Sequence, residues 1–169
     1  MKLPIILAAA MALALPALAQ QAPPRPAPPP PRAKGPSLAP AVQAAQAAVA
    51  ACADKGYHVT ALVVDSAGDP VVLLSGDGAS LLSQKFARVK TATVIKYRAS
   101  SGEVAARAKT DARLDAEIKA DPNIGMAFAG AVLLMRGGEF IGAFAVSGAG
   151  GPQMDEACVQ EALAGVTLQ

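Results

Sequence analysis

The sequence predicts an α+β domain in which an antiparallel β-sheet of two hairpins, about four to five strands, is flanked by helices. Pairs of apolar, β-branched segments joined by short turns occur at 58–75 and again at 126–146, and short turns join antiparallel strands. Helical patterns precede, separate and follow the two hairpins. The resulting order, α-ββ-αα-ββ-α, favours an α+β domain over a Rossmann fold, in which strands and helices alternate.

Two segments at the start of the chain are predicted to lie outside this domain. Residues 1–19 combine a basic start, an apolar run and the small-residue site Ala17-Leu18-Ala19, which is typical of a secretory signal peptide. We therefore expect a periplasmic or secreted protein. Residues 20–36 hold eight prolines, three basic residues and no acid. This composition predicts a disordered, extended tether that adds nothing to stability. Residues 37–169 remain as a single domain.

The first helix is expected from about Leu38 to Lys55. Ser37 is a candidate N-cap and Gly56 is a natural stop. Its apolar stripe consists of Val42, Ala45, Val49 and Cys52. The first hairpin follows, with strands at His58–Val64 and Val71–Ser75 around a turn at 65–70.

The second helix is expected over about 81–98, with Ser80 as its cap. Its predicted core face comprises Leu82, Phe86, Val89, Thr93 and Tyr97. Ser100 and Glu103 then form a capping-box pattern that opens a more polar helix through about Lys119. The second hairpin has strands within 126–135 and 140–146, joined at Gly137-Gly138. A glycine loop at 147–151 leads to a closing helix from Pro152 to about Ala164.

Charge and motif content exclude several classes of function. Residues 37–169 hold eleven basic and thirteen acidic residues, so the domain lacks the basic excess of a nucleic-acid binder. No segment is long and apolar enough to be a membrane span. One histidine and two distant cysteines do not make a zinc site, and no CxxCH motif attaches haem covalently. The glycine loop lacks a phosphate-binding motif, which favours a turn with a helix cap.

Several residues are candidates for a binding site, each beside a structural alternative. Ser83, Lys90 and Tyr97 recur every seven residues and form one helical stripe. Lys90 could hold a carboxylate there, or it could snorkel at the helix edge, where it would contribute little to stability. His58 is the only imidazole available to a haem iron, or it is an ordinary residue near a strand end. Cys52 and Cys158 form either a disulfide or two buried thiols.

Three segments resemble motifs of the GlcG/HbpS family. Residues 63–72 (VVDSAGDPVV) are similar to its VVDxxGxxV hairpin. The run Asp77-Gly78-Ala79, with Ser83, Ala87, Lys90 and Thr91, is similar to DGAxxxSxxxAxxKA. Residues 137–148 (GGEFIGAFAVSG) resemble dGeviGaigVSG and precede Asp155 in the last helix. The resemblance covers essentially all of 37–166.

The resemblance implies a small α+β domain, commonly oligomeric, that binds haem or a related tetrapyrrole. We therefore expect an exported, non-covalent haem-binding protein, more a binding protein than an enzyme, that forms a homo-oligomer. Its pocket would lie between helix 81–98 and the sheet, with Lys90 available to a propionate. The alternative is an enzyme or enzyme accessory acting on a small organic acid such as a 2-hydroxy acid, with Ser83, Lys90 and Asp65 as its polar groups.

Overall fold

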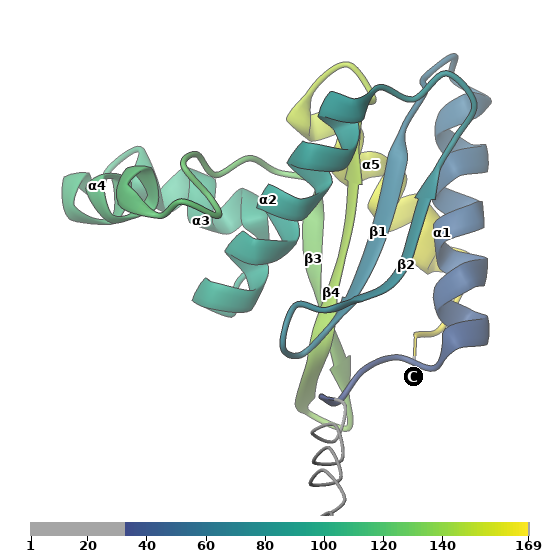
Figure 1. The fold of residues 1–169 in the computed structure, drawn as a ribbon, viewed down its shortest axis with the longest axis horizontal. Coiled ribbons are helices and arrows are strands. Elements are labelled where there is room, and N and C mark those ends of the chain that lie inside the picture. Colours follow the sequence, from purple (N-terminus) through teal and green to yellow (C-terminus); the bar gives the residue numbers. More distant parts are fainter. Residues whose placement is uncertain (1–32, 169) are drawn as a thin grey trace, which may run out of the picture. The chain divides into compact units, whose positions relative to one another are not determined.

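The computed structural model describes residues 33–168 (Figure 1). The predicted signal peptide and residues 20–32 of the predicted tether lie outside the described residues. The elements, in chain order, are α1 (Leu38–Ala53), β1 (Thr60–Asp65), β2 (Pro70–Ser75), α2 (Leu81–Tyr97), α3 (Ser101–Ala108), α4 (Ala112–Ala120), β3 (Ala131–Arg136), β4 (Glu139–Ser147) and α5 (Pro152–Gly165). The predicted α+β class is confirmed, as is the succession of helices and hairpins.

The four strands form one antiparallel sheet in the order β2-β1-β4-β3. Each hairpin pairs its own two strands, and β1 pairs with β4 at the centre, where Thr60 lies opposite Ser147 and Asp65 opposite Gly142. Every residue of β1 is buried, whereas β2 is an edge strand that is at best half buried. The two hairpins therefore join through their most apolar strands, which places the core at the centre of the sheet.

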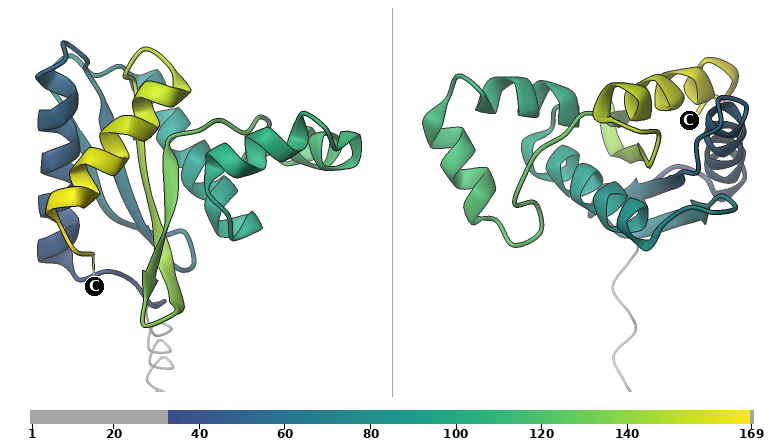
Figure 2. Two further views of the ribbon diagram at one scale, coloured as in Figure 1. Left: turned by 180° about the vertical axis from the view of Figure 1, so that it is seen from behind. Right: turned by 90° about the horizontal axis from the view of Figure 1, so that it is seen from above.

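Helices cover both faces of the sheet (Figure 2). Ala61 and Val63 of β1 pack in the cluster that contains α1 and α5, whereas Leu62 and Val64 pack in the cluster that contains α2. This alternation follows from the two-residue period of a strand, which sends successive side chains to opposite faces. The domain thus has three layers, with α1 and α5 on one face and α2 on the other.

The buried face of α1 is made of alanines. The predicted stripe included Val42 and Val49, but these two are only half buried. The fully buried positions are Ala41, Ala44, Ala45, Ala48 and Cys52. Ser37 is the N-cap residue, as predicted, although its side chain makes no capping hydrogen bond. Small side chains let α1 approach the sheet and α5 closely, and this close approach outweighs the larger apolar volume of valine.

The predicted core face of α2 is right for Val89 and Thr93, which are buried, and for Tyr97, which packs against an apolar cluster, but it is wrong for Leu82 and Phe86. Leu82 is 55% exposed and Phe86 is half buried. The buried residues of α2 are Ser83, Ala87, Val89, Lys90, Thr91, Thr93 and Val94. The sheet surface beneath them is built from Ala131, Ala143 and Ala145. Hydrophobic periodicity missed this face because it includes a serine and a lysine.

The third predicted helix is divided into α3 and α4. Asp111 begins α4 because its side chain accepts hydrogen bonds from the N–H groups of Arg113 and Leu114. The capping box at the start of α3 is confirmed, with Ser100 and Glu103 bonded reciprocally. Together with one side of α2, these helices enclose a separate apolar cluster of Val89, Val104, Leu114, Ile118 and Ile124.

A disulfide joins Cys52 of α1 to Cys158 of α5, with a Cα–Cα distance of 5.8 Å. The sequence left the disulfide and two free thiols open, and the structure has the disulfide. The bond closes a loop of 106 residues, and native disulfides of this kind typically contribute about 2–5 kcal/mol to stability. It therefore holds together the two helices that cover one face of the sheet.

The residues just before α1 contact the tips of both hairpins. The Lys34 carbonyl accepts a hydrogen bond from the Ser66 N–H at 2.8 Å, and the Gly35 carbonyl accepts one from the Arg136 guanidinium at 3.3 Å. The Lys34 ammonium also pairs with Glu139. Residues 33–36 were predicted to belong to a tether without contacts, but Lys34 and Gly35 are bonded to the domain. Among the described helices, none has both the length and the apolar character required to cross a bilayer.

Candidate functional site

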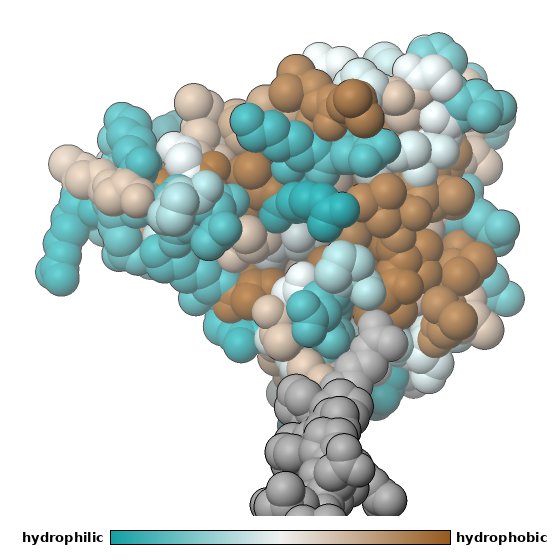
Figure 3. Space-filling model, viewed as in Figure 1, coloured by the Kyte–Doolittle hydropathy of each residue, from teal (hydrophilic) through white to brown (hydrophobic). Residues whose placement is uncertain are grey.

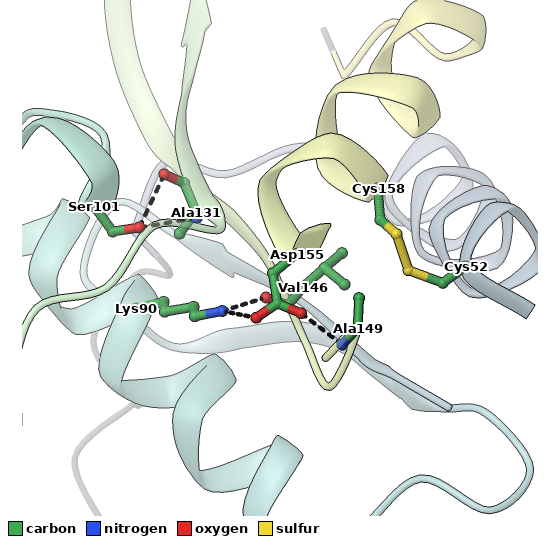
Figure 4. A network of polar contacts seen from close by, with 8 residues as sticks. All are labelled: Cys52, Lys90, Ser101, Ala131, Val146, Ala149, Asp155 and Cys158. Atoms are coloured by element: carbon green, nitrogen blue, oxygen red, sulfur yellow. Dashed lines mark hydrogen bonds and ion pairs between the residues drawn. A yellow bond between two sulfur atoms is a disulfide. The ribbon is translucent and has the colours of Figure 1, made fainter. Parts of the chain in front are cut away.

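A buried ion pair joins Lys90 of α2 to Asp155 of α5. Lys90 is 2% exposed and Asp155 is 5% exposed. The Lys90 ammonium donates hydrogen bonds to Asp155 Oδ2 at 2.5 Å and to the Val146 carbonyl at 2.9 Å (Figure 4). Because α2 and α5 cover opposite faces of the sheet, the Lys90 side chain crosses from one face to the other where β3 begins.

Gly130 leaves the space for this crossing. It lies just before β3, and its φ of +116° is one that residues with side chains rarely adopt. A Cβ at this position would lie 2.6 Å from Lys90 Nζ and 2.7 Å from Asp155 Cβ. A glycine is therefore required here both by the backbone conformation and by the ion pair.

The other carboxylate oxygen of Asp155 is hydrogen-bonded to the glycine loop at 147–151. Asp155 Oδ1 accepts a hydrogen bond from the Ala149 N–H at 2.7 Å. Asp155 lies in the first turn of α5, where a carboxylate also interacts favourably with the helix dipole. The loop is thus folded around the protein's own carboxylate, which agrees with a turn and helix cap and not with a phosphate cradle.

Burial lowers the pKa of Lys90 below its usual 10.5. The charge of Asp155, its hydrogen bond to Lys90 and the charge of Glu156 all act in the opposite direction but are smaller. The alternative of a snorkelling lysine is wrong, because the ammonium is inside the domain. The ammonium is also already paired, so it does not offer an uncompensated positive charge to a carboxylate ligand.

A small cavity adjoins this ion pair. It has a volume of about 250 Å³ and is lined by Phe86, Lys90, Phe128, Ser147, Gly148, Gly151, Pro152 and Asp155. The rings of Phe86 and Phe128 meet edge to face, with their centroids 5.2 Å apart. An amine, a carboxylate and two aromatic rings thus surround one small space.

A larger cavity of about 510 Å³ lies between α2 and β1, which is the place predicted for the pocket from the sequence. Its apolar lining includes Leu62, Val64, Ile95 and Ile124, and its rim carries Arg88 and Lys96. Lys96 pairs with Glu117 and Asp121. In the described part of the chain no acid pairs with Arg88, so Arg88 is the cation available to a ligand there.

The other polar residues predicted for the site are not brought together with Lys90. The Ser83 hydroxyl donates to the Ser80 carbonyl at 2.6 Å and so accepts from Thr60, 2.8 Å away. Asp65 is at the far end of β1, where Oδ1 accepts from the N–H groups of Ala67 and Asp69. Ser83 therefore joins α2 to β1, and Asp65 shapes the turn of the first hairpin.

Tyr97 and His58 also lie away from the ion pair. The Tyr97 hydroxyl donates to Glu117 at 3.1 Å, on the side of α2 that faces α4. His58 is exposed, and its Nδ1 donates to the Asp77 carbonyl at 2.7 Å. That bond leaves Nε2 as the nitrogen with a free lone pair in the neutral ring. Within residues 33–168 no group of three His, Cys, Asp or Glu side chains is placed to hold a metal ion.

Sequence reasoning missed Asp155 as the partner of Lys90, and it missed Gly130, Phe128 and Arg88. The sequence offered two signals for Asp155, its place after the family's second hairpin motif and its position in the first turn of a helix that follows a glycine loop. Phe86 was assigned to the core instead of to a cavity wall. These residues come from separate elements, so only the folded chain assembles them.

Fold and site together define a small three-layer α+β domain with a cavity on each side of α2. The chain matches the model of the haem degrading protein HbpS-like family over residues 37–164 and belongs to that family. No curated protein matches the sequence.

Solved structures agree with this assignment. The crystal structure of HbpS is 30% identical, with a TM-score of 0.69, over 79% of this chain and 92% of that one. A double mutant of HbpS from Streptomyces reticuli is 29% identical, with a TM-score of 0.70, over 85% and 97%. The PduOC:heme complex is 26% identical, with a TM-score of 0.69, over 80% and 99%.

Proposed function

We propose that this chain is an exported protein that binds haem or a related tetrapyrrole without a covalent bond. The observation that carries the proposal is membership of the HbpS-like family, supported by the likeness to a relative solved as a heme complex. The state of the cysteines supports non-covalent binding. The chain has two cysteines, and both are used in the disulfide, so neither thiol is free to attach a haem vinyl group.

The larger cavity beside α2 is the better candidate for the ligand. Pockets for small molecules and cofactors usually measure about 300–1,000 Å³; the cavity of about 510 Å³ falls in this range and the one of about 250 Å³ does not. The lining is mixed, and its apolar part, with Leu62, Val64 and Ile95, suits a porphyrin face. Arg88 on its rim suits a propionate, because guanidinium groups match carboxylate geometry.

The lining of this cavity includes no histidine, cysteine, methionine or tyrosine, which are the side chains that usually ligate haem iron. His58 has a suitable free nitrogen but is not among the lining residues. The protein would thus bind the tetrapyrrole through contacts with its ring and its propionates, and not through the iron. We therefore expect iron-free protoporphyrin IX to bind within about threefold of the affinity of haemin, a difference of less than 1 kcal/mol.

The test is a titration of the purified domain with haemin and with protoporphyrin IX, followed by absorbance and fluorescence at low salt. We expect saturable binding of both, and affinity about tenfold weaker in Arg88→Met, at the lower end for a hydrogen bond between charged groups because Arg88 is exposed. Arg107→Met, an exposed arginine of α3, is the matched control. Absence of a saturable change would exclude tetrapyrrole binding. A shifted haem spectrum in His58→Ala would instead make His58 the iron ligand.

Export and self-association belong to the same proposal. A disulfide is typical of oxidising compartments, which supports the signal peptide predicted at 1–19. The edge strand β2 leaves Val71, Val72, Leu73 and Leu74 only partly buried, and Figure 3 shows apolar surface over this strand. Exposed apolar edges are prone to pair with another chain, which supports a homo-oligomer, and light scattering of the exported protein measures it directly.

A further inference from the structure

We propose that the Lys90 amine forms a Schiff base with a small neutral aldehyde or ketone held in the cavity of about 250 Å³ beside it. This reaction goes beyond tetrapyrrole binding and uses a different hollow, on the other side of α2. It is drawn from three features that meet at one point: a buried amine, a carboxylate in contact with it, and an aromatic-lined space.

Lys90 differs from every other lysine of the described domain. Lys34, Lys55, Lys85, Lys96, Lys109 and Lys119 are all exposed. Water stabilises the charge of an exposed ammonium, whereas burial removes that water and lowers the pKa of Lys90. A larger fraction of Lys90 is therefore the neutral amine, which is the nucleophilic form.

Asp155 is placed to carry the protons. Its Oδ2 lies 2.5 Å from Lys90 Nζ, so it can accept a proton from the ammonium. Entry of an apolar ligand removes water from the cavity and favours this transfer, because a neutral amine and a neutral carboxylic acid have no charge to desolvate. Asp155 can then return the proton to the carbonyl oxygen of the ligand.

The reaction balances without any further reactant. The nitrogen lone pair attacks the carbonyl carbon to form a carbinolamine, as the carbonyl oxygen takes a proton from Asp155. The carbon–oxygen bond then breaks and the oxygen leaves as water. Two of the three ammonium protons depart in that water, the third stays on the iminium nitrogen, and Asp155 ends as the carboxylate.

The surroundings select for a neutral, compact compound. The carboxylates of Asp155 and Glu156 both act on Lys90, so an additional negative charge would be repelled. Phe86 and Phe128 provide apolar walls. A cavity of about 150 Å³ is known to hold benzene, so about 250 Å³ accommodates an aldehyde of the size of benzaldehyde.

The test uses benzaldehyde as the probe, with borohydride to reduce any imine to a stable benzylamine. The folded, disulfide-bonded domain is treated with less than one equivalent of aldehyde, and the labelled residue is located by peptide mass spectrometry. We expect the label to fall predominantly on Lys90. Label confined to the exposed lysines would overturn the proposal.

Two variants separate cavity chemistry from general reactivity. Phe86→Trp reduces the volume of the cavity and leaves both Lys90 and Asp155 unchanged. We expect about tenfold less label on Lys90, equivalent to about 1.4 kcal/mol, with unchanged label elsewhere. Leu81→Trp, at a position that is 82% exposed, is the control and should label as the wild type does. Equal label on Lys90 in both variants would overturn the role of the cavity. Haemin titration of Phe86→Trp shows separately whether the proposed tetrapyrrole site is intact.

Discussion

Lys90 shows how the environment of one residue decides its role. A buried ion pair loses the hydration of both charges, and the mutual attraction of the two groups only partly compensates for that loss. Here Lys90 and Asp155 also satisfy each other and two backbone groups, at Val146 and Ala149. The pair therefore connects α2, β4 and α5, and its removal one partner at a time is expected to be costly.

We predict that Lys90→Met destabilises the domain by about 3–5 kcal/mol, because it leaves the Asp155 carboxylate buried without its counter-charge. Urea unfolding at neutral pH measures the effect. Lys85→Met, on the exposed side of the same helix, serves as control and should change stability by less than about 0.5 kcal/mol. A loss below about 1 kcal/mol in Lys90→Met would mean that the ion pair is not buried in solution.

Among the helices and strands, α2 takes part in two separate apolar clusters. One side packs on the alanine surface of the sheet, and another encloses the separate cluster with α3 and α4. Polar contacts lie at the solvent-exposed edge of the interface between α2 and α4. Lys96 of α2 donates to Asp121 at 2.9 Å and lies 3.1 Å from Glu117 of α4. These contacts, chiefly the hydrogen bonds from Lys96, lower the pKa of both carboxyl groups.

The lowered pKa values predict an acid-sensitive interface. A carboxyl group whose pKa is lower in the folded state stabilises the fold above its unfolded pKa, about 4, and loses that contribution as the pH falls through the folded value. We expect Lys96→Met to reduce the difference in unfolding free energy between pH 7 and pH 3. Lys109→Met, an exposed lysine of the same region, is the control. An unchanged pH dependence in Lys96→Met would contradict the prediction.

At the scale of the whole domain, long-range connections hold the layers together. The disulfide joins α1 to α5 on one face, and the Lys90–Asp155 pair joins α2 to α5 across the end of the sheet. The segment before α1 adds a third connection, because Lys34 and Gly35 contact the tips of both hairpins. Stability is thus distributed among links between residues that are distant in sequence.

The contacts of the segment before α1 can be tested by truncation. A chain that begins at Ser37 should unfold a few degrees below one that begins at Ala33, because it loses two hydrogen bonds worth about 0.5–1.5 kcal/mol each. Thermal unfolding of the two chains, followed by circular dichroism, measures the difference. Equal melting temperatures would restore the expectation that the entire Pro-rich segment is a tether without contacts.

The α+β class, the two hairpins, the capping box at Ser100 and the resemblance to the family could all be predicted from the amino-acid sequence. These features are local: strand alternation, turn residues and helix caps are set by neighbours along the chain. The buried face of α2, the acid that pairs with Lys90 and the pairing of the cysteines could be learned only from the folded chain. Lys90 and Asp155 are 65 residues apart, and Gly130, between them in sequence, shows no local sign that its missing side chain makes room for both. Such contacts depend on how the layers stack, and that stacking follows from the complementary shapes of distant segments.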